Sequence, residues 1–471
     1  MMTGIAGCVC ALTLGVALSV PSLTSAEGDL PITVTRFSDR ALVVSLEQGH
    51  ANMLALSTEK GIVIFNTLWS NRIAAEYRRI IENEFGRDDF VYVINTGAPL
   101  IRFGGNAAFP EAEIIAHEYC LEDMTENVRN LDTLKPRKVR TYDYKAKEMQ
   151  EEFMGLGPGS PRAAIKHERA VLFRRMADDL SEPFVARLPT MTFSDRLTLD
   201  LGNMTLELVY FGNRTILARI PEERIVMPGD AFHPVHILMS TIYPVTQDVP
   251  RWLDVLDGAL DGPYEVEHVV GHWRGIWGRE DLVKRRDYIR QLWDDIAVLT
   301  EEGVSYREAK ERLSMDTRYA YLTEWDYYRE HGHRWVLEDH LRNVRAFWKE
   351  FHEPASEAVG LALGEAGLEG ALRKFEEIRA DTLHRYFLDE SGFNRLGYRL
   401  LSTGDFEEAV EIFKMNAELH PDSWNAWDSL GEAYMCAGER DRAITYYEKS
   451  VDLNPDNQNG MDMLERLRAE K

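Results

Sequence analysis

Aspartate and histidine side chains near the middle of the chain are the residues best suited to bind a metal ion. Asp230 is followed closely by His233 and His236, and His272 lies further along. A catalytic zinc ion takes about three such carboxylate or imidazole ligands plus a water molecule. Two histidines three positions apart share one face of a helix, but Pro234 lies between them and disfavours a regular helix. Either the pair belongs to a metal site or it is polar surface, and the sequence favours polar surface.

Other catalytic arrangements find little support. His331, His333 and His340 are spaced poorly for three ligands of one metal, so we expect no metal site there. The chain contains neither a Gly-x-Ser-x-Gly nucleophile elbow nor a Walker-type phosphate loop. The glycine-rich segment at 155–159 contains a proline and lacks the strand-to-helix context of a phosphate loop, so it predicts a flexible, exposed insertion.

The stretch Val93–Glu118 carries the most specific motif of the chain. It reads VINTGAPLIRFGGNAAFPEAEIIAHE, in which the segments VINT and GGNA flank a short loop. It resembles the metal-ligand loop of the metallo-β-lactamase superfamily, in which a strand ends in a His-x-His-x-Asp-His run that a Gly-Gly-Asn follows. The resemblance implies that the four ligand places hold Gly97, Pro99, Ile101 and Arg102. Gly, Pro and Ile have no side-chain donor, and Arg is not deprotonated at working pH.

The resemblance extends over roughly Val34 to Asp281. It implies that Asp230 stands at the bridging Asp of the family and His272 at the last His ligand. The strand that ends in a supporting Asp in the family ends here in Asn66, and the His-bearing loop after Tyr210 is shortened. Two of seven ligand places would be filled, and none of the three His residues that hold the first metal would be present. We therefore expect no metal.

Arg102 suggests a substitute for the missing cation. The resemblance places it near Asp230, where a guanidinium could pair with the carboxylate and hold the strand ends together. Replacing Arg102 by Ala would then destabilise the fold, because a partly buried carboxylate would be left unpaired. Arg214 lies near the same cleft and would either complete an anion-binding pocket with Arg102 or point to water.

Hydrophobic patterning predicts the elements that position these residues. Strands are expected at 41–46, 53–57, 61–65 and 90–95, with a helix capped by Asn71 before the last of them. A second β-rich half begins near Leu188, with strands at 197–201, 205–211, 216–220 and 224–227. Two such halves with helices outside predict an α+β fold, a four-layer αββα sandwich over residues 34–281.

The C-terminal part contains an internal repeat of 34 residues. Its anchors are Leu396-Gly397 with Leu430-Gly431, Ala409 with Ala443, Phe413 with Tyr447, and Pro421 with Pro455. This pattern resembles the tetratricopeptide repeat, a helix-turn-helix unit. It predicts an all-α domain at 356–471 with repeats at about 390–423 and 424–457, a looser hairpin before them, and a capping helix after them. A helical connector would span 282–355, where crowded aromatic residues favour helix packing over a ligand groove.

Charge and the N-terminal segment limit partners and location. A net charge of −24 and a pI near 5.0 disfavour nucleic acid and anionic lipid. Residues 1–26 predict a signal peptide, since an apolar run precedes Thr24-Ser25-Ala26, so we expect a secreted or periplasmic protein without membrane insertion after cleavage. Cys120 and Cys436 lie in different expected domains, so both are interpreted as small buried hydrophobes.

Two functional hypotheses follow. The first is an exported non-catalytic protein, in which a metallo-β-lactamase-like domain without most ligands is joined to a repeat module that binds a protein or peptide. The second is a metal-dependent hydrolase with an altered site made of Asp230, His272 and His233 or His236, acting on an ester, amide, thioester or phosphoester. The first is favoured because the ligand positions are lost while the strands and turns around them are kept.

Overall fold

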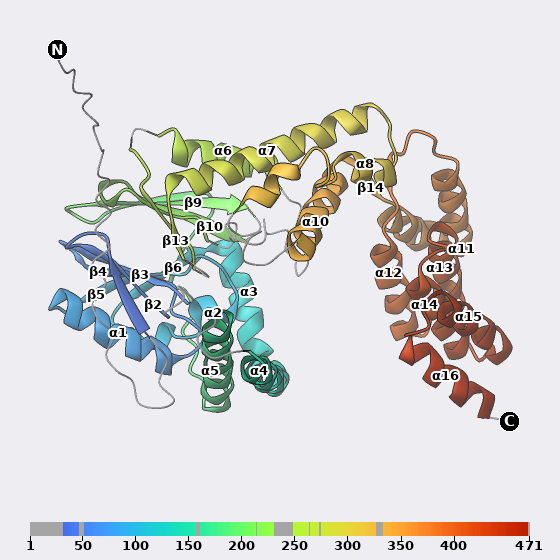
Figure 1. Ribbon diagram of the computed structural model, residues 1–471, viewed down its shortest axis with the longest axis horizontal. Helices are drawn as coiled ribbons and strands as arrows, with labels where there is room; N and C mark the ends of the chain where they lie inside the picture. Colours follow the sequence, from blue (N-terminus) through green and yellow to red (C-terminus); the bar gives the residue numbers. More distant parts are fainter. Residues whose placement is uncertain are drawn as a thin grey trace, which may run out of the picture. The chain divides into compact units, whose positions relative to one another are not determined.

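The computed structural model describes residues 32–46, 51–156, 161–212, 214–229, 248–262, 264–272, 275–325 and 333–469 (Figure 1). The chain divides into two compact units, Met1–Arg290 and Gln291–Lys471. The expected signal peptide at 1–26 lies outside the described residues. Within the described ranges, no helix is long and apolar enough to cross a membrane.

The first sheet of the N-terminal unit has seven strands in chain order (Figure 1). Its strands are β1 (Ile32–Arg36), β2 (Ala41–Leu46), β3 (Met53–Thr58), β4 (Gly61–Phe65), β5 (Phe90–Ile94), β6 (Glu113–His117) and β7 (Met191–Phe193). The pairs from β1 to β4 are antiparallel, whereas those from β4 to β7 are parallel. Sequence patterning predicted β2 to β5 and missed β1, β6 and β7.

The second sheet has six strands in the order β13-β12-β11-β10-β9-β8. They are β8 (Arg196–Asp200), β9 (Thr205–Gly212), β10 (Thr215–Ile220), β11 (Ile225–Met227), β12 (His268–Val270) and β13 (Ile276–Trp277). Only β11 and β12 pair in parallel. The β9–β10 connection is short, as the shortened family loop implied.

Both faces of the first sheet are buried, because its strands alternate between two apolar cores. In β4, Ile62 and Ile64 face a core shared with helices α1 (Asn71–Phe85) and α5 (Pro161–Ser181). Val63 and Phe65 face the core that fills the space between the two sheets. This period of two is what a pleated strand requires when each face is covered. On the outer side of the second sheet, Trp252 of α6 (Val249–Leu260) stacks on Phe211 of β9 at 5.8 Å.

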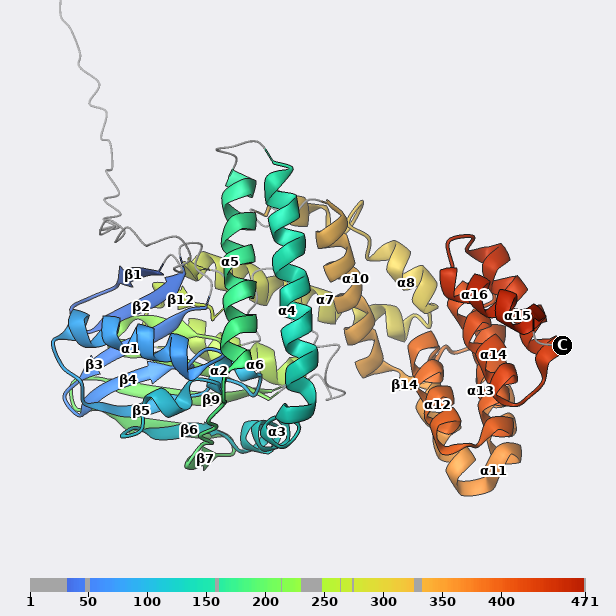
Figure 2. The ribbon, with the colours of Figure 1, turned by 90° about the horizontal axis from the view of Figure 1, so that it is seen from below.

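Three further helices complete the part of the N-terminal unit described here. They are α2 (Leu100–Phe103), α3 (Glu118–Arg129) and α4 (Leu131–Met154). Helices α4 and α5 stand side by side as a long hairpin (Figure 2). Of this hairpin, the sequence indicated only the exposed connection near 155–161. The N-cap of α1 is Ser70, whose Oγ accepts from the Ile73 amide at 3.4 Å, and not Asn71 as expected.

The C-terminal unit is helical apart from one small two-stranded sheet, β14 (Glu353–Pro354) with β15 (Tyr386–Phe387). The helix α7 (Arg279–Glu301) contains the boundary between the units. It is followed by α8 (Tyr306–Arg312), α10 (His333–Phe351), α11 (Ala355–Arg379), α12 (Glu390–Thr403), α13 (Phe406–Leu419), α14 (Trp424–Cys436), α15 (Arg440–Leu453) and α16 (Gln458–Ala469). Cys120 is buried as expected, but Cys436 is exposed, since it ends α14 at the surface.

The helix α11 is itself a tight hairpin. Its backbone leaves the helical region at Ala366 and at Gly367, where φ is +62°. A Cβ on Gly370 would lie 2.6 Å from the carbonyl oxygen of Ala362, an approach that a straight helix does not allow over eight residues. Ala371 and Phe375 of the second half pack with Phe393 of α12 in one core. The looser hairpin expected before the two repeats is therefore present.

Candidate functional site

The loop at the family's metal-ligand places follows β5 and presents no ligand cluster. Gly97 is buried, and Pro99 precedes α2 with φ −58° and ψ 144°. Ile101 packs against the apolar core that α1 and α5 share with the first sheet. At Gly97, Pro99 and Ile101, three of the four places, there is therefore either no side-chain donor or an apolar side chain packed in the core.

Buried amide and hydroxyl groups close this loop. Asn95 and Asn106 exchange two hydrogen bonds, Nδ2 of each donating to Oδ1 of the other at 3.1 and 2.9 Å. Thr67 Oγ1 donates to Asn106 Oδ1 at 2.7 Å, and Asn106 Nδ2 also donates to the Arg187 carbonyl at 2.9 Å. Thr67, Asn95 and Asn106 are fully buried. We call these three residues the amide network; its neutral side chains join the loop to the strand ends of β4 and β5.

The loop also lies against the start of α1 at very short range. A Cβ on Gly104 would lie 2.5 Å from the Trp69 carbonyl oxygen, and one on Gly105 would lie 2.1 Å from that of Thr67. Backbone meets backbone at these two positions, so only glycine fits. This explains why the Gly-Gly-Asn motif is kept although the ligands are not.

The backbone of Arg102 is fixed by hydrogen bonds, and its side chain is buried. Its carbonyl accepts from the Thr67 amide at 2.8 Å and from Asn95 Nδ2 at 3.0 Å. The side chain is 4% exposed, and burial holds its pKa well below the ordinary value for arginine. A buried guanidinium requires compensating acceptors. Asp230, its expected partner, lies outside the described residues, so the pairing stays a prediction.

Neutral hydrogen bonds also join the strand ends around the former site. Asn66, at the supporting-Asp position, adopts a left-handed φ of 61° and accepts from the amide and hydroxyl of Thr96 at 3.0 and 3.1 Å. The Thr96 carbonyl in turn accepts from Thr215 Oγ1 at 3.0 Å and from the Ile216 amide at 3.2 Å. Thr96 thus links β4, β5 and β10, and with them the two sheets.

His272 lies at the end of β12, as the resemblance implied. It is buried, and its carbonyl accepts from the Asn52 amide at 3.0 Å. Asn52 Nδ2 also donates to the carbonyl of Gly271 at 2.5 Å. His233 and His236 fall outside the described residues, as Asp230 does.

A zinc ion does not fit the donors that can be placed. Of the five ligand positions in the described ranges, only His272 carries a metal-binding side chain. Across the same ranges, no three His, Cys, Asp or Glu side chains are placed to share a metal ion.

Arg214 pairs with a carboxylate and does not point to water. Its guanidinium contacts Asp123 of α3, and its Cζ lies 5.9 Å from the centre of the Tyr119 ring. Partial burial lowers the pKa of Arg214, but the bond to Asp123 outweighs it and raises the pKa overall. The Arg214 carbonyl accepts from Cys120 Sγ at 3.0 Å. The pair fastens α3 to the start of β10.

His117 was not singled out in the sequence, yet it organises the other side of α3. Its Nδ1 accepts from the Tyr119 amide at 3.2 Å and caps the helix, while Nε2 lies 2.8 Å from the Ser194 carbonyl. Its ring stacks on Tyr210 at 3.9 Å. Burial lowers the pKa of His117, so the neutral form is favoured. Both nitrogens are engaged, which makes it a structural residue.

Of the three histidines singled out in the connector, the side chain of His340 lies in the described part of the chain. His340 is buried in α10, with Nε2 2.6 Å from the Leu313 carbonyl. Burial lowers its pKa to about 4. His331 and the side chain of His333 lie outside the described part of the chain, so the absence of a metal site there stays a prediction.

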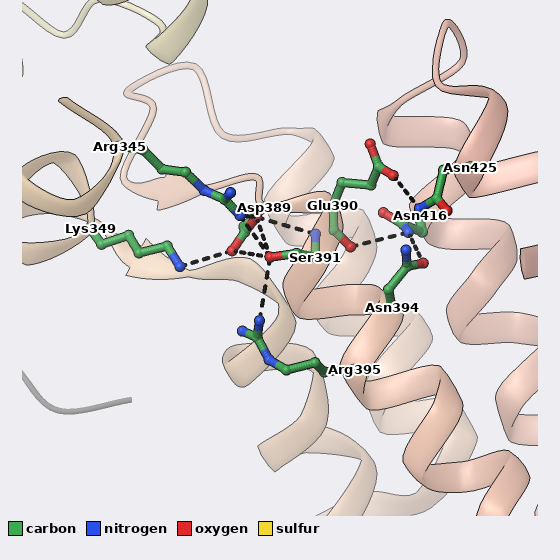
Figure 3. A network of polar contacts seen from close by, with 9 residues as sticks. All are labelled: Arg345, Lys349, Asp389, Glu390, Ser391, Asn394, Arg395, Asn416 and Asn425. Atoms are coloured by element: carbon green, nitrogen blue, oxygen red, sulfur yellow. Dashed lines mark hydrogen bonds and ion pairs between the residues drawn. The ribbon is translucent and has the colours of Figure 1, made fainter. Parts of the chain in front are cut away.

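A polar cluster around Asp389 fixes the first repeat (Figure 3). Asp389 caps α12 by accepting from the Ser391 amide at 3.2 Å. Its carboxylate contacts Arg345 and lies 2.9 Å from Lys349 Nζ, both on α10. The Asp389 side chain is 5% exposed, whereas its two cations are 41% and 33% exposed. The repeats are thereby tied to the helices that precede them.

A second set of bonds joins the helices of the repeats (Figure 3). Asn416 of α13 donates to Asn394 Oδ1 at 2.8 Å, and Asn425 of α14 donates to Glu390 Oε1 at 2.9 Å. Tyr398 Oη donates to Glu432 Oε2 at 2.9 Å and lies 3.2 Å from Ser429 Oγ, whose hydroxyl can donate to it. The first helices of the two repeats, α12 and α14, therefore lie side by side.

The Arg102–Asp230 pairing can be tested by a double-mutant cycle. We expect Arg102→Ala and Asp230→Ala each to lower the free energy of unfolding. We expect the double variant to lose less than the sum, with a coupling of about 1–3 kcal/mol. Urea unfolding of the four proteins measures this. Additive losses would show that the two residues do not pair.

Comparison with known proteins identifies a family for part of the C-terminal unit. The tetratricopeptide-repeat family matches residues 424–457, the second of the two repeats. No curated protein matches the sequence. Among solved structures, a stereoselective inverting sec-alkylsulfatase, Pisa1 from Pseudomonas sp., is 14% identical with a TM-score of 0.47; the match covers 91% of this chain and 66% of the sulfatase. This chain thus spans slightly less than two thirds of that protein.

Two metallo-β-lactamase structures are similar to the N-terminal part. That from Pontibacter korlensis is 13% identical over 55% of this chain and 99% of its own, with a TM-score of 0.36. That from Hirschia baltica is 14% identical over 55% and 97%, also with a TM-score of 0.36. The described part of the chain is a two-sheet sandwich with helices outside, followed by a mainly helical region that carries a tetratricopeptide repeat.

Proposed function

We propose that this chain is a non-catalytic binding protein, in which the sandwich is a structural body and the repeats bind a protein or peptide partner. The amide network carries the proposal. At the place where a hydrolase of this fold would hold its metal ligands, Thr67, Asn95 and Asn106 bond to one another and to the backbone. A loop closed in this way has no side chain left to activate water.

The binding half of the proposal is supported by the surface of α12 and α14. Repeat modules bind partners along surfaces that neighbouring repeats build together. Here Tyr398 of α12 is 40% exposed, and its hydroxyl bonds to α14. Polar side chains held in this way suit an extended peptide, whose backbone needs donors and acceptors.

Metal content tests the non-catalytic half. We expect the purified full-length protein to retain less than about 0.1 equivalent of zinc, iron or manganese after dialysis, since a tight site needs three ligands. Elemental analysis by mass spectrometry gives the number. The Asp230→Ala and His272→Ala variants should contain the same trace amount. The p-nitrophenyl esters of sulfate, phosphate and acetate should not be hydrolysed above the buffer rate.

The opposite outcome would favour the metal-dependent hydrolase. In that case the parent protein would retain about one equivalent of metal, and the Asp230→Ala variant would lose it. The rate of hydrolysis would fall together with the metal content. Such a result would overturn the proposal.

A further inference from the structure

A basic stripe runs along α4 in an otherwise acidic protein. Between Lys135 and Lys147 there are six Lys or Arg residues and one Asp, although the whole chain has a net charge of −24. Arg137, Arg140, Tyr144 and Lys147 recur at intervals of three or four and so lie on one face of the helix. All four are exposed, Tyr144 by 67%. We call these four residues the α4 stripe.

The cations of the stripe are not used within the hairpin. Nearby cations on α5 are matched: Arg174 pairs with Asp143 at 2.6 Å, and Arg175 with Asp179 at 2.9 Å. Across the described part of the chain, by contrast, no carboxylate pairs with Arg137, Arg140 or Lys147. Three charges on one face, without counter-charges, create a local positive potential that the acidic remainder does not share.

The stripe continues into a cavity between α4 and α5. The cavity has a volume of about 430 Å³, and its lining includes Lys147, Glu151 and Met154 of α4 and Val171, Arg174 and Asp178 of α5. Met154 is 67% exposed at its margin. The lining combines apolar side chains with charged groups of both signs. It suits an apolar side chain of a partner, whose acidic neighbours would be directed to the cations of the α4 stripe and not to the cavity.

We propose that the α4 stripe and this cavity bind an acidic amphipathic helix of a partner protein. From Arg137 to Met154 the surface extends about 26 Å, which is five turns of a partner helix. Carboxylates at helical spacing would pair with Arg137, Arg140 and Lys147, while a Leu or Phe on the same face enters the cavity. The partner helix would then complete a three-helix layer with α4 and α5. This surface is distinct from the repeats.

Charge and shape favour a helix over a polyanion. A nucleic acid or an anionic bilayer would meet the stripe together with the acidic remainder of the chain, and the net charge of −24 repels both. A phosphate group would also leave the apolar walls of the cavity unused. An acidic helix needs only the stripe and fills the cavity.

The test uses a defined probe with the full-length protein. The probe is a labelled synthetic helix that carries Glu at intervals of three and four and one central Leu on the same face. Binding is measured by fluorescence anisotropy at low salt. We expect R137E/R140E/K147E to weaken binding about tenfold or more, because paired charges become repulsive. Met154→Glu, which places a charge at the cavity margin, should also weaken binding.

The matched control is R79E/R307E/R399E. These three exposed arginines lie on α1, α8 and α12, so the control changes the net charge by the same amount elsewhere. It should bind the probe within about twofold of the parent. Circular dichroism checks that every variant is folded. A probe with Lys in place of Glu should not bind.

Four outcomes would overturn the proposal. The first is an equal loss of affinity in the two triple variants, and the second is that the parent does not bind the probe. The third is that phosphatidylserine vesicles or duplex oligonucleotide bind through the stripe in place of the probe. The fourth is a change of oligomeric mass in the stripe variant. The last would show that a second copy of this chain occupies the surface; sedimentation velocity measures it.

Discussion

Gly105→Ala is expected to lower the free energy of unfolding by more than about 4 kcal/mol, or to prevent the N-terminal unit from folding. The new Cβ would lie 2.1 Å from the Thr67 carbonyl oxygen and 2.3 Å from the Ala74 Cβ. Neither neighbour can move freely, because Thr67 follows a central strand and Ala74 is buried in α1. Relief would require the loop to leave α1, which would break the amide network. Soluble yield and urea unfolding measure the loss.

Gly258→Ala provides the matched control for this substitution. Gly258 lies inside α6, and beyond its chain neighbours and the nearby backbone of its own helix no heavy atom lies within 4 Å of an added Cβ. Alanine has the higher helix propensity, so a gain of about 0.5–1 kcal/mol is expected. A Gly105→Ala protein that unfolds within about 1 kcal/mol of the parent would show that the loop does not lie against α1.

Asp389→Ala is the second substitution with a large expected effect, about 3 kcal/mol. It removes the N-cap of α12 and the contacts with Arg345 and Lys349 together. Asp389→Asn keeps the cap but not the charge, so it should lose less, and the difference between the variants gives the contribution of the cap. Arg345 and Lys349 are partly exposed and can turn to water, which keeps the loss below that of a fully buried pair. Thermal and urea unfolding measure both variants.

The contribution of Asp389 should depend on pH in a defined direction. Burial raises the pKa of its carboxyl group, but Arg345, Lys349 and Ser391 outweigh burial and hold the pKa below the ordinary 3.8. A depressed folded-state pKa stabilises the protein above the unfolded pKa, and this stability is lost as the pH falls through the folded pKa. The difference in free energy of unfolding between the parent and Asp389→Asn should thus be constant near neutrality and should shrink below about pH 4. A gap that widens on acidification would contradict the ion-pair assignment.

The sequence predicted the strands that alternate between two cores, because their period of two is a local property. In β2 and β4 every second residue faces the same core, so patterning alone was sufficient. The 34-residue repeat was equally legible, since its anchors recur at a fixed distance. The strands β1, β6 and β7 were missed because they are too short to show a clear periodicity. In β6, the apolar run Ile114-Ile115-Ala116 before His117 was a usable signal.

The site was predicted less completely, because its bonds join residues far apart in the chain. The loss of metal ligands at Gly97, Pro99 and Ile101 could be read directly. The amide network found beside these positions could not be predicted, because Asn106 bonds to Thr67 and to Arg187, which are 39 and 81 residues away in the sequence. Asp123 and Asp389 were not distinguishable among 78 acidic residues until the fold placed cations beside them.

The amide network also determines which solution conditions this loop can tolerate. A loop held by histidines and a metal opens when acid protonates the imidazoles or when a chelator removes the ion. Asparagine and threonine side chains do not titrate, and they bind no ion that a chelator could take. The hydrogen bonds among Thr67, Asn95 and Asn106 therefore have no titratable donor or acceptor, so within this network acid does not remove a bonding group.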